Sequence, residues 1–268
     1  MKDRELDACR VPRVRRRDVL ALPAALAGGL AVAGCAGGIG AMTGPMSPTG
    51  TPTGTPTGSP TEGRTEEEVP VTPPEDLMRE HGVLKRILLI YREGIRRIEA
   101  GEPVPARELN AGARLIRSFI EEYHERLEER YVFPPLVQAG KLTDVVPVLV
   151  RQHQRGRVVT GRIIDATGTP AAGPTGTGSP APGRQRLVAD MTAFIRMYEP
   201  HEAREDTVVF PALRDVVPPR RFLEMAEIFE DEEHRRFGQA GFTGVVNQVA
   251  DIEKALGIYD LAQFTPRG

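Results

Sequence analysis

Apolar side chains recur every three or four residues through most of the chain between residues 74 and 256, which is the spacing of amphipathic α-helices. No stretch shows a convincing β-strand alternation. We therefore predict an all-α domain over 74–259, an antiparallel four-helix bundle with one or two additional C-terminal helices, followed by a tail over 260–268. The pattern places the helices over about 74–101, 106–131 and 142–167, then from about 184 through 205, from 218 onward, and over 245–256.

Prolines refine the expected ends of these helices. Pro134 and Pro135 should stop the second helix, because proline has no backbone N–H to donate and clashes with the preceding turn. Pro200 lies inside the fourth helix, where it should produce a kink that re-aims His201.

Glycine and proline concentrate in two segments. Residues 36–73 are rich in Thr, Pro and Gly, and residues 167–183 repeat that composition between the third and fourth helices. Such sequences bury too little apolar area to offset the entropy lost on ordering. We expect a disordered linker over 36–73 and a disordered insertion in the bundle over 167–183.

The first 35 residues have the features of an export signal. Three arginines at 15–17 precede an apolar run over 21–34, which is too short for a permanent membrane-spanning helix. The arginine pair and its apolar neighbours resemble a twin-arginine signal. Residues 32–35 resemble a lipobox, after which Cys35 would be lipidated. We expect an exported protein of the cell envelope, anchored by lipid to the outer face of the cytoplasmic membrane or in the periplasm; an uncleaved N-terminal anchor is the alternative.

Composition and charge exclude some classes of function. The net charge of −2 provides no general basic surface, so no nucleic-acid partner is expected. Cys9 and Cys35 are the two cysteines of the chain and both precede the domain. Any metal in the domain must therefore be held by nitrogen and oxygen ligands. The sequence does not indicate an oligomeric state.

The domain contains an internal repeat built on two H-x-x-x-E motifs. The stretch over 119–136 returns, with a two-residue insertion, over 194–213. Residues four apart in a helix lie on one face, so each motif directs an imidazole and a carboxylate to one point. Buried carboxylates are costly unless a cation compensates their charge. The shared residues are His124, Glu128, Phe133, Pro134 and Leu136, which recur 77 residues later as His201, Glu205, Phe210, Pro211 and Leu213.

Four of the five histidines fall one to a helix at core positions of the apolar stripes: His81, His124, His153 and His201. One histidine on an apolar face is more often a packed core residue. Four on successive helices, two of them paired with glutamate, favour a metal site instead. Imidazole and carboxylate ligands without thiolate suit iron, manganese or zinc, and two bridging carboxylates favour a pair of ions.

With these motifs, the region from about Pro74 to Leu213 resembles the hemerythrin-like, H-H-E cation-binding family, a four-helix bundle with a non-haem di-iron centre. The resemblance implies that the four histidines are terminal ligands and that Glu128 and Glu205 bridge two iron ions, with manganese or zinc as alternatives. It also implies a protein that binds or senses O2, NO or peroxide, or that handles iron. Which ligand, metal or redox partner is physiological, and whether the protein is an enzyme, stays open.

The chain departs from the respiratory oxygen carriers of this family. They have a second histidine one turn after the histidine of the third helix, where this chain has Arg157, and their last motif uses Asp one residue further on. The missing imidazole would leave an iron less saturated, which favours redox chemistry, sensing or peroxide handling over simple O2 carriage. His234 in the fifth helix would restore a fifth imidazole, unless it forms only a surface pair with Glu230.

Residues next to the predicted ligands are candidates for outer contacts that orient them. The alternative for each is a solvated acid or a packing aromatic. The candidates are Glu125, Glu202, Tyr123 and Tyr198.

Two other functions compete with this interpretation. A ferritin-like di-iron oxidase or peroxidase needs two E-x-x-H pairs. Glu121 supplies one before His124, but Tyr198 stands at the matching place before His201. A metal-free interaction module of the envelope would use the histidines for packing alone.

Overall fold

A computed structural model of the chain describes residues 71–168, 182–266 and 268. The predicted export signal, the lipobox with Cys35 and nearly all of the predicted linker lie outside the described residues, as does most of the predicted insertion. Three edges of these segments are described. The first helix begins at Pro73, and the helices beside the insertion reach Gly168 and begin again at Pro182.

The described residues form helices and contain no strand. Three stretches wind more widely, as π-helix, and each of them is continued by an α-helical segment of the same rod. In chain order the segments are α1 (Pro73–Glu99), α2 (Ala106–Leu115), π-helical η2 (Ile116–His124), α3 (Glu125–Leu127), π-helical η3 (Glu128–Val132), α4 (Phe133–Gln138), α5 (Val146–Gly168), α6 (Pro182–Arg204), π-helical η4 (Glu205–Val209), α7 (Phe210–Val216), α8 (Pro219–Phe237), 3₁₀-helical η5 (Gly238–Ala240), α9 (Gly241–Leu256) and 3₁₀-helical η6 (Leu261–Phe264).

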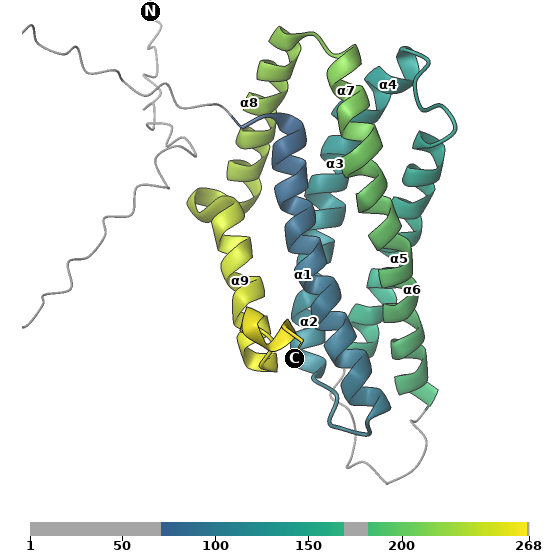
Figure 1. Cartoon of the computed structure of the whole chain (residues 1–268), viewed down its shortest axis with the longest axis vertical. Coiled ribbons are helices and arrows are strands. Elements are labelled where there is room, and N and C mark those ends of the chain that lie inside the picture. The colour runs from purple at the N-terminus through teal and green to yellow at the C-terminus, as the bar shows by residue number, and fades with distance from the viewer. Residues whose placement is uncertain (1–70, 169–181, 267) are drawn as a thin grey trace, which may run out of the picture. The chain divides into compact units, whose positions relative to one another are not determined.

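Four antiparallel rods make up the bundle: α1, the α2–α4 run, α5, and the α6–α7 run (Figure 1). Each rod runs opposite to the one before it, and α8 and α9 pack beside α1. The prediction of an all-α bundle with additional C-terminal helices is confirmed.

One apolar core joins the bundle to its C-terminal helices. The stripe of α1 is fully buried at Leu84, Ile87 and Tyr91, and Phe229 of α8 and Val249 of α9 belong to the same core. A bidentate ion pair adds to this contact, because the Arg86 guanidinium donates to both carboxylate oxygens of Glu253 at 2.9 and 2.5 Å. The C-terminal helices are thus an integral layer of the domain.

The prediction that Pro134 and Pro135 stop the second helix is wrong. The rod continues through α4 to Gln138. The wide winding of η3 ends just before these prolines, so they fall in the first turn of a new α-helical segment, where a missing N–H costs no hydrogen bond. The same arrangement recurs at Pro211 in α7. Helix α6 also continues through Pro200 to Arg204.

Within residues 71–168 and 182–266, no helix has the length and apolar character needed to cross a membrane.

Gly156 of α5 allows a close approach of α6. A Cβ atom at this position would lie 2.0 Å from the hydroxyl oxygen of Tyr198. That tyrosine cannot move aside easily, because it is buried, its ring stacks on Phe194 at 4.3 Å, and its hydroxyl donates to Glu125 at 2.7 Å. Glycine is therefore required here by packing.

We predict that Gly156→Ala lowers the free energy of unfolding by about 1–3 kcal/mol, since it overpacks a rigid contact. Gly82 is the matched control, because it is also inside a helix and a Cβ there meets no atom within 4 Å. Gly82→Ala should raise the free energy of unfolding by about 0.5–1 kcal/mol. Urea unfolding of the metal-free protein measures both, and a Gly156→Ala protein as stable as the wild type would contradict the packing argument.

Candidate metal centre

The antiparallel topology brings the four core histidines to one half of the bundle. His81 and His153 lie in the first halves of α1 and α5, whereas His124 and His201 lie in the second halves of the two rods that run the opposite way. All four imidazoles are buried. Four residues from separate helices therefore meet at one level of the core.

The imidazoles form two pairs that face each other through their Nε2 atoms. The Nε2 atoms of His81 and His124 are 3.1 Å apart, and those of His153 and His201 are 3.2 Å apart. Each pair also has a carboxylate whose oxygen lies close enough to share an ion with it: Glu128 for the first pair and Glu205 for the second.

The two carboxylates lie between the imidazole pairs. Glu128 directs Oε1 toward Nε2 of His124 at 3.6 Å and Oε2 toward Nε2 of His153 at 3.5 Å. Glu205 directs Oε2 toward Nε2 of both His81 and His201, at 3.4 and 3.1 Å. Each carboxylate thus reaches one imidazole of either pair, which is the arrangement of a bridge between two ions.

These carboxylates are fully buried, and apart from the imidazole Nε2 atoms that face them, their four oxygens have no hydrogen-bond partner among the described residues. An unpaired buried carboxylate costs several kcal/mol. The donor set of nitrogen and oxygen atoms is one that iron, manganese and zinc accept. The residues present therefore fit a metal site, because a cation would supply the partner that the protein does not.

The Nδ1 atoms of the four imidazoles take part in a closed ring of contacts between neighbouring rods. The Nδ1 atom of each histidine lies near an oxygen from the neighbouring rod, which favours the tautomer that donates from Nδ1 and presents the Nε2 lone pair to an ion. The contacts run around the bundle: Glu80 of α1 to His124 (2.8 Å), Glu129 of η3 to His153 (3.2 Å), Gln152 of α5 to His201 (2.9 Å), and Asp206 of η4 to His81 (2.7 Å).

Sequence reasoning missed all four residues of this ring. Each stands directly beside a predicted ligand in the sequence, as Glu80 does before His81 and Asp206 does after Glu205. In a helix the next residue points about 100° away, which turns it from the centre toward an adjacent rod. The sequence does contain a signal for these residues, because a polar residue stands beside each predicted ligand. Finding them requires asking which neighbouring helix that polar residue would contact.

The widely wound segments coincide with the site. His124 ends η2, Glu128 begins η3 and Glu205 begins η4. Wide turns of this kind are uncommon and occur frequently at functional sites. In η4, Glu205 contacts His201 in the centre, and Asp206, at the position where the carriers use Asp, contacts His81.

Without metal, the pKa values of the groups in the site shift in different directions. Burial opposes a charge on His81, but contacts with Asp206 and Glu205 outweigh it and raise the pKa of His81 to about 9. Burial, reinforced by the charge of Glu205, raises the pKa of Glu128 well above its usual range. Burial acts the same way on Glu205, but His201 and His81 overcome it and lower the pKa of that carboxyl.

The predicted outer residues lie close to the centre but bond to groups other than the ligand Nδ1 atoms. The ring of Tyr198 lies 5.3 Å from that of His201, and a carboxylate oxygen of Glu125 lies within 4.8 Å of a ring nitrogen of His153. Tyr198 and Glu125 bond to each other, and Glu125 also accepts from Arg157 at 2.7 Å. Glu202 is buried and accepts from Lys85 at 2.6 Å. Tyr123 packs against the rings of two phenylalanines on the other side of its helix.

Two further candidate ligands do not join the cluster. His234 in α8 donates from Nδ1 to the backbone carbonyl of Glu230 at 3.1 Å, and it belongs to none of the ligand groups found in the described part of the chain. Glu121 is also absent from these groups, and its nearest charged contact is Arg117 at 3.1 Å.

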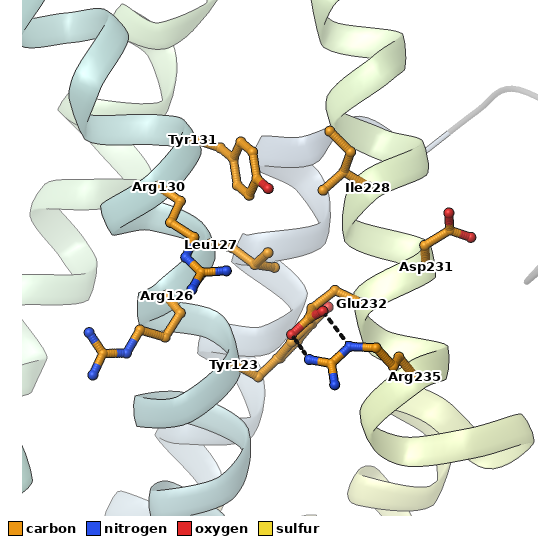
Figure 2. A pocket seen from close by; sticks show the side chains of 9 residues that line it. All are labelled: Tyr123, Arg126, Leu127, Arg130, Tyr131, Ile228, Asp231, Glu232 and Arg235. Carbon is orange, nitrogen blue, oxygen red and sulfur yellow. Dashed lines mark hydrogen bonds and ion pairs between the residues drawn. The ribbon is translucent and has the colours of Figure 1, made fainter.

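A pocket of about 240 Å³ lies on the outer side of the second rod, between that rod and α8 (Figure 2). Tyr131 and Ile228 line its upper part, and the guanidinium of Arg130 points into it. The pocket contains none of the four core histidines. It is thus separate from the metal centre.

The geometry defines a cation-binding helical bundle, and the comparisons agree. The family model of the hemerythrin HHE cation-binding domain matches residues 72–213. The chain belongs to this family. It is 59% identical over 253 residues to uncharacterized proteins of Mycobacterium tuberculosis and Mycobacterium bovis, with 94% of this chain and 91% of each relative covered. No solved structure matches the chain.

We predict that Zn²⁺ binding to the metal-free protein releases protons at pH 7, because His81, with a pKa of about 9, and Glu128 must lose theirs. Protons compete with the metal below these pKa values, so affinity should rise with pH between 6 and 8, by about tenfold per pH unit for each proton displaced. Calorimetry in buffers of different ionisation enthalpy measures both effects. His234→Ala should keep the same slope, and a pH-independent affinity without proton release would contradict the prediction.

Proposed function

We propose that this chain is a non-haem di-iron protein that binds O2, NO or peroxide. The observation that carries the proposal is the placement of Glu128 and Glu205, each within reach of imidazoles from both pairs. A single ion would leave one imidazole pair and two carboxylate oxygens without a partner. Two ions would give a partner to both imidazole pairs and to both carboxylates.

In this proposal His81 and His124 would hold one ion and His153 and His201 the other, and the carboxylates of Glu128 and Glu205 would be shared between them. Bound iron would supply the redox change and the free coordination positions for a small ligand. The residues around it orient the imidazoles through Nδ1 and keep bulk water out of a buried site.

Two observations weigh against the competing functions. In a ferritin-like oxidase, Glu121 would act as a ligand, but it lies with Arg117 rather than in the cluster. A metal-free module would have to keep four carboxylate oxygens buried without hydrogen bonds. Buried polar groups in native proteins nearly always have a hydrogen-bond partner.

We predict that anaerobic loading with Fe²⁺, followed by oxidation, gives about two irons per chain and a visible oxo-to-iron charge-transfer band. His124→Ala and His201→Ala should each lower the iron content, because each removes a ligand of a different ion. His234→Ala is the matched control and should load as the wild type does. Elemental analysis and optical spectra decide the matter: a colourless, iron-free wild-type protein would reject the proposal.

We also propose that the domain works in the cell envelope, exported by the arginine-pair signal and held by lipid on Cys35. Export of a folded protein would allow metal loading before secretion. Cys35→Ala should move the protein from the membrane fraction to the soluble fraction, as measured by immunoblotting of both fractions. An unchanged distribution would contradict lipid anchoring at this residue.

A further inference from the structure

A second group of buried polar side chains lies beside the centre and is not used by it. It consists of Tyr91 of α1, Glu121 of η2 and Thr160 of α5. All three are at most 1% exposed. Their side-chain oxygens have no hydrogen-bond partner of good geometry in the described part of the chain. A buried carboxyl group in this condition needs a physical explanation.

Glu121 lies between the surface and the centre. Its Oε2 atom is 3.1 Å from Nε of Arg117, a side chain that is 34% exposed. Toward the centre, Glu121 lies three residues before His124 and one helical turn before Glu125. Glu121 therefore has a solvent-facing partner in Arg117 and, one helical turn further along, the negative charge of Glu125.

The groups that face Glu121 leave it balanced between its two protonation states. Burial, assisted by the charge of Glu125, raises the pKa of Glu121 to about 7, while Thr160, Arg117 and Arg157 oppose this rise. The Tyr91 hydroxyl faces it from α1, and Tyr198 of α6 also senses its charge. A change of one unit of charge nearby is enough to shift such a balanced group.

We propose that Glu121 takes up a proton when the metal centre gains an electron and releases it when the centre is oxidised. This inference rests on the proposed function, because it requires a redox-active centre. In the forward step an external one-electron reductant gives one electron to the centre, and solvent gives one proton to the Glu121 carboxylate. Charge in the buried core then stays constant, which lowers the cost of changing the oxidation state.

The test compares midpoint potentials of the iron-loaded protein at several pH values between 6 and 8. Uptake of one proton per electron makes the potential fall as pH rises, by up to about 59 mV per unit, the equivalent of a tenfold change for a one-electron couple. Glu121→Gln should flatten this slope. Glu122→Gln, an exposed acid beside it, should leave the slope unchanged. Equal slopes in the wild type and Glu121→Gln would overturn the proposal.

Infrared difference spectra of reduction give a readout independent of the potential. The reduced wild type should gain the carbonyl band of a protonated carboxylic acid, shifted in D2O and absent in Glu121→Gln. Thr160→Val keeps Glu121 but removes a group that favours its ionised form, so the pH range of the band should move upward. If Glu121→Gln fails to fold or to load iron, the Thr160→Val variant decides the question. An unchanged pH range of the band in Thr160→Val would then overturn the proposal. A wild type that binds no iron rejects the proposed function itself, whereas normal iron loading without the band rejects only the role of Glu121.

Discussion

The buried charge of two carboxylates is the constraint on which the rest of the site depends. Glu128 and Glu205 lie inside the bundle without hydrogen bonds of their own. A protein core cannot tolerate two such groups at this spacing unless protons or cations compensate them. In the metal-free state the raised pKa values of His81 and Glu128 favour protons on both groups, which provides this compensation. The same groups that hold these protons are the ones that a pair of cations would use, so metal and protons compete for one set of atoms.

The ring of Nδ1 contacts turns this constraint into a defined geometry. Each contact joins two rods, and the four together return to the rod on which they began. A shift of any one helix would therefore break two contacts, one through its imidazole and one through its carboxylate or amide. The bundle and the site thus stabilise each other. The layer formed by α8 and α9 adds to the rigidity of α1 through Arg86 and the shared core.

The sequence predicted the part of this structure that repeats with a helical period. Apolar spacing predicted the rods, and the two H-x-x-x-E motifs with His81 and His153 predicted which side chains converge. Two features of the structure could not be predicted from the sequence. The wide winding at Glu128 and Glu205 has no local sequence signature, and it changed the effect of Pro134, which starts a segment instead of ending one. The Nδ1 partners were hidden because each binds across the bundle, and periodicity along one helix says nothing about its neighbour.

Arg157 shows how one position alters the character of the centre. It stands one turn after His153, where the carriers place an imidazole, and a guanidinium has no lone pair to give to an ion. Its Nη2 atom instead donates to Glu125 and Glu129, at 2.7 Å each. Gly156 leaves room beside it for Tyr198, whose hydroxyl donates to Glu125. This side of the site therefore supplies fixed charges rather than a ligand.

The two carboxylates and one guanidinium on this side leave a net negative charge there, which favours ions in their higher oxidation state. Arg157 also offers no ligand atom to an ion, and under the proposed function both effects would suit a centre that exchanges electrons with a small ligand better than one that only carries it.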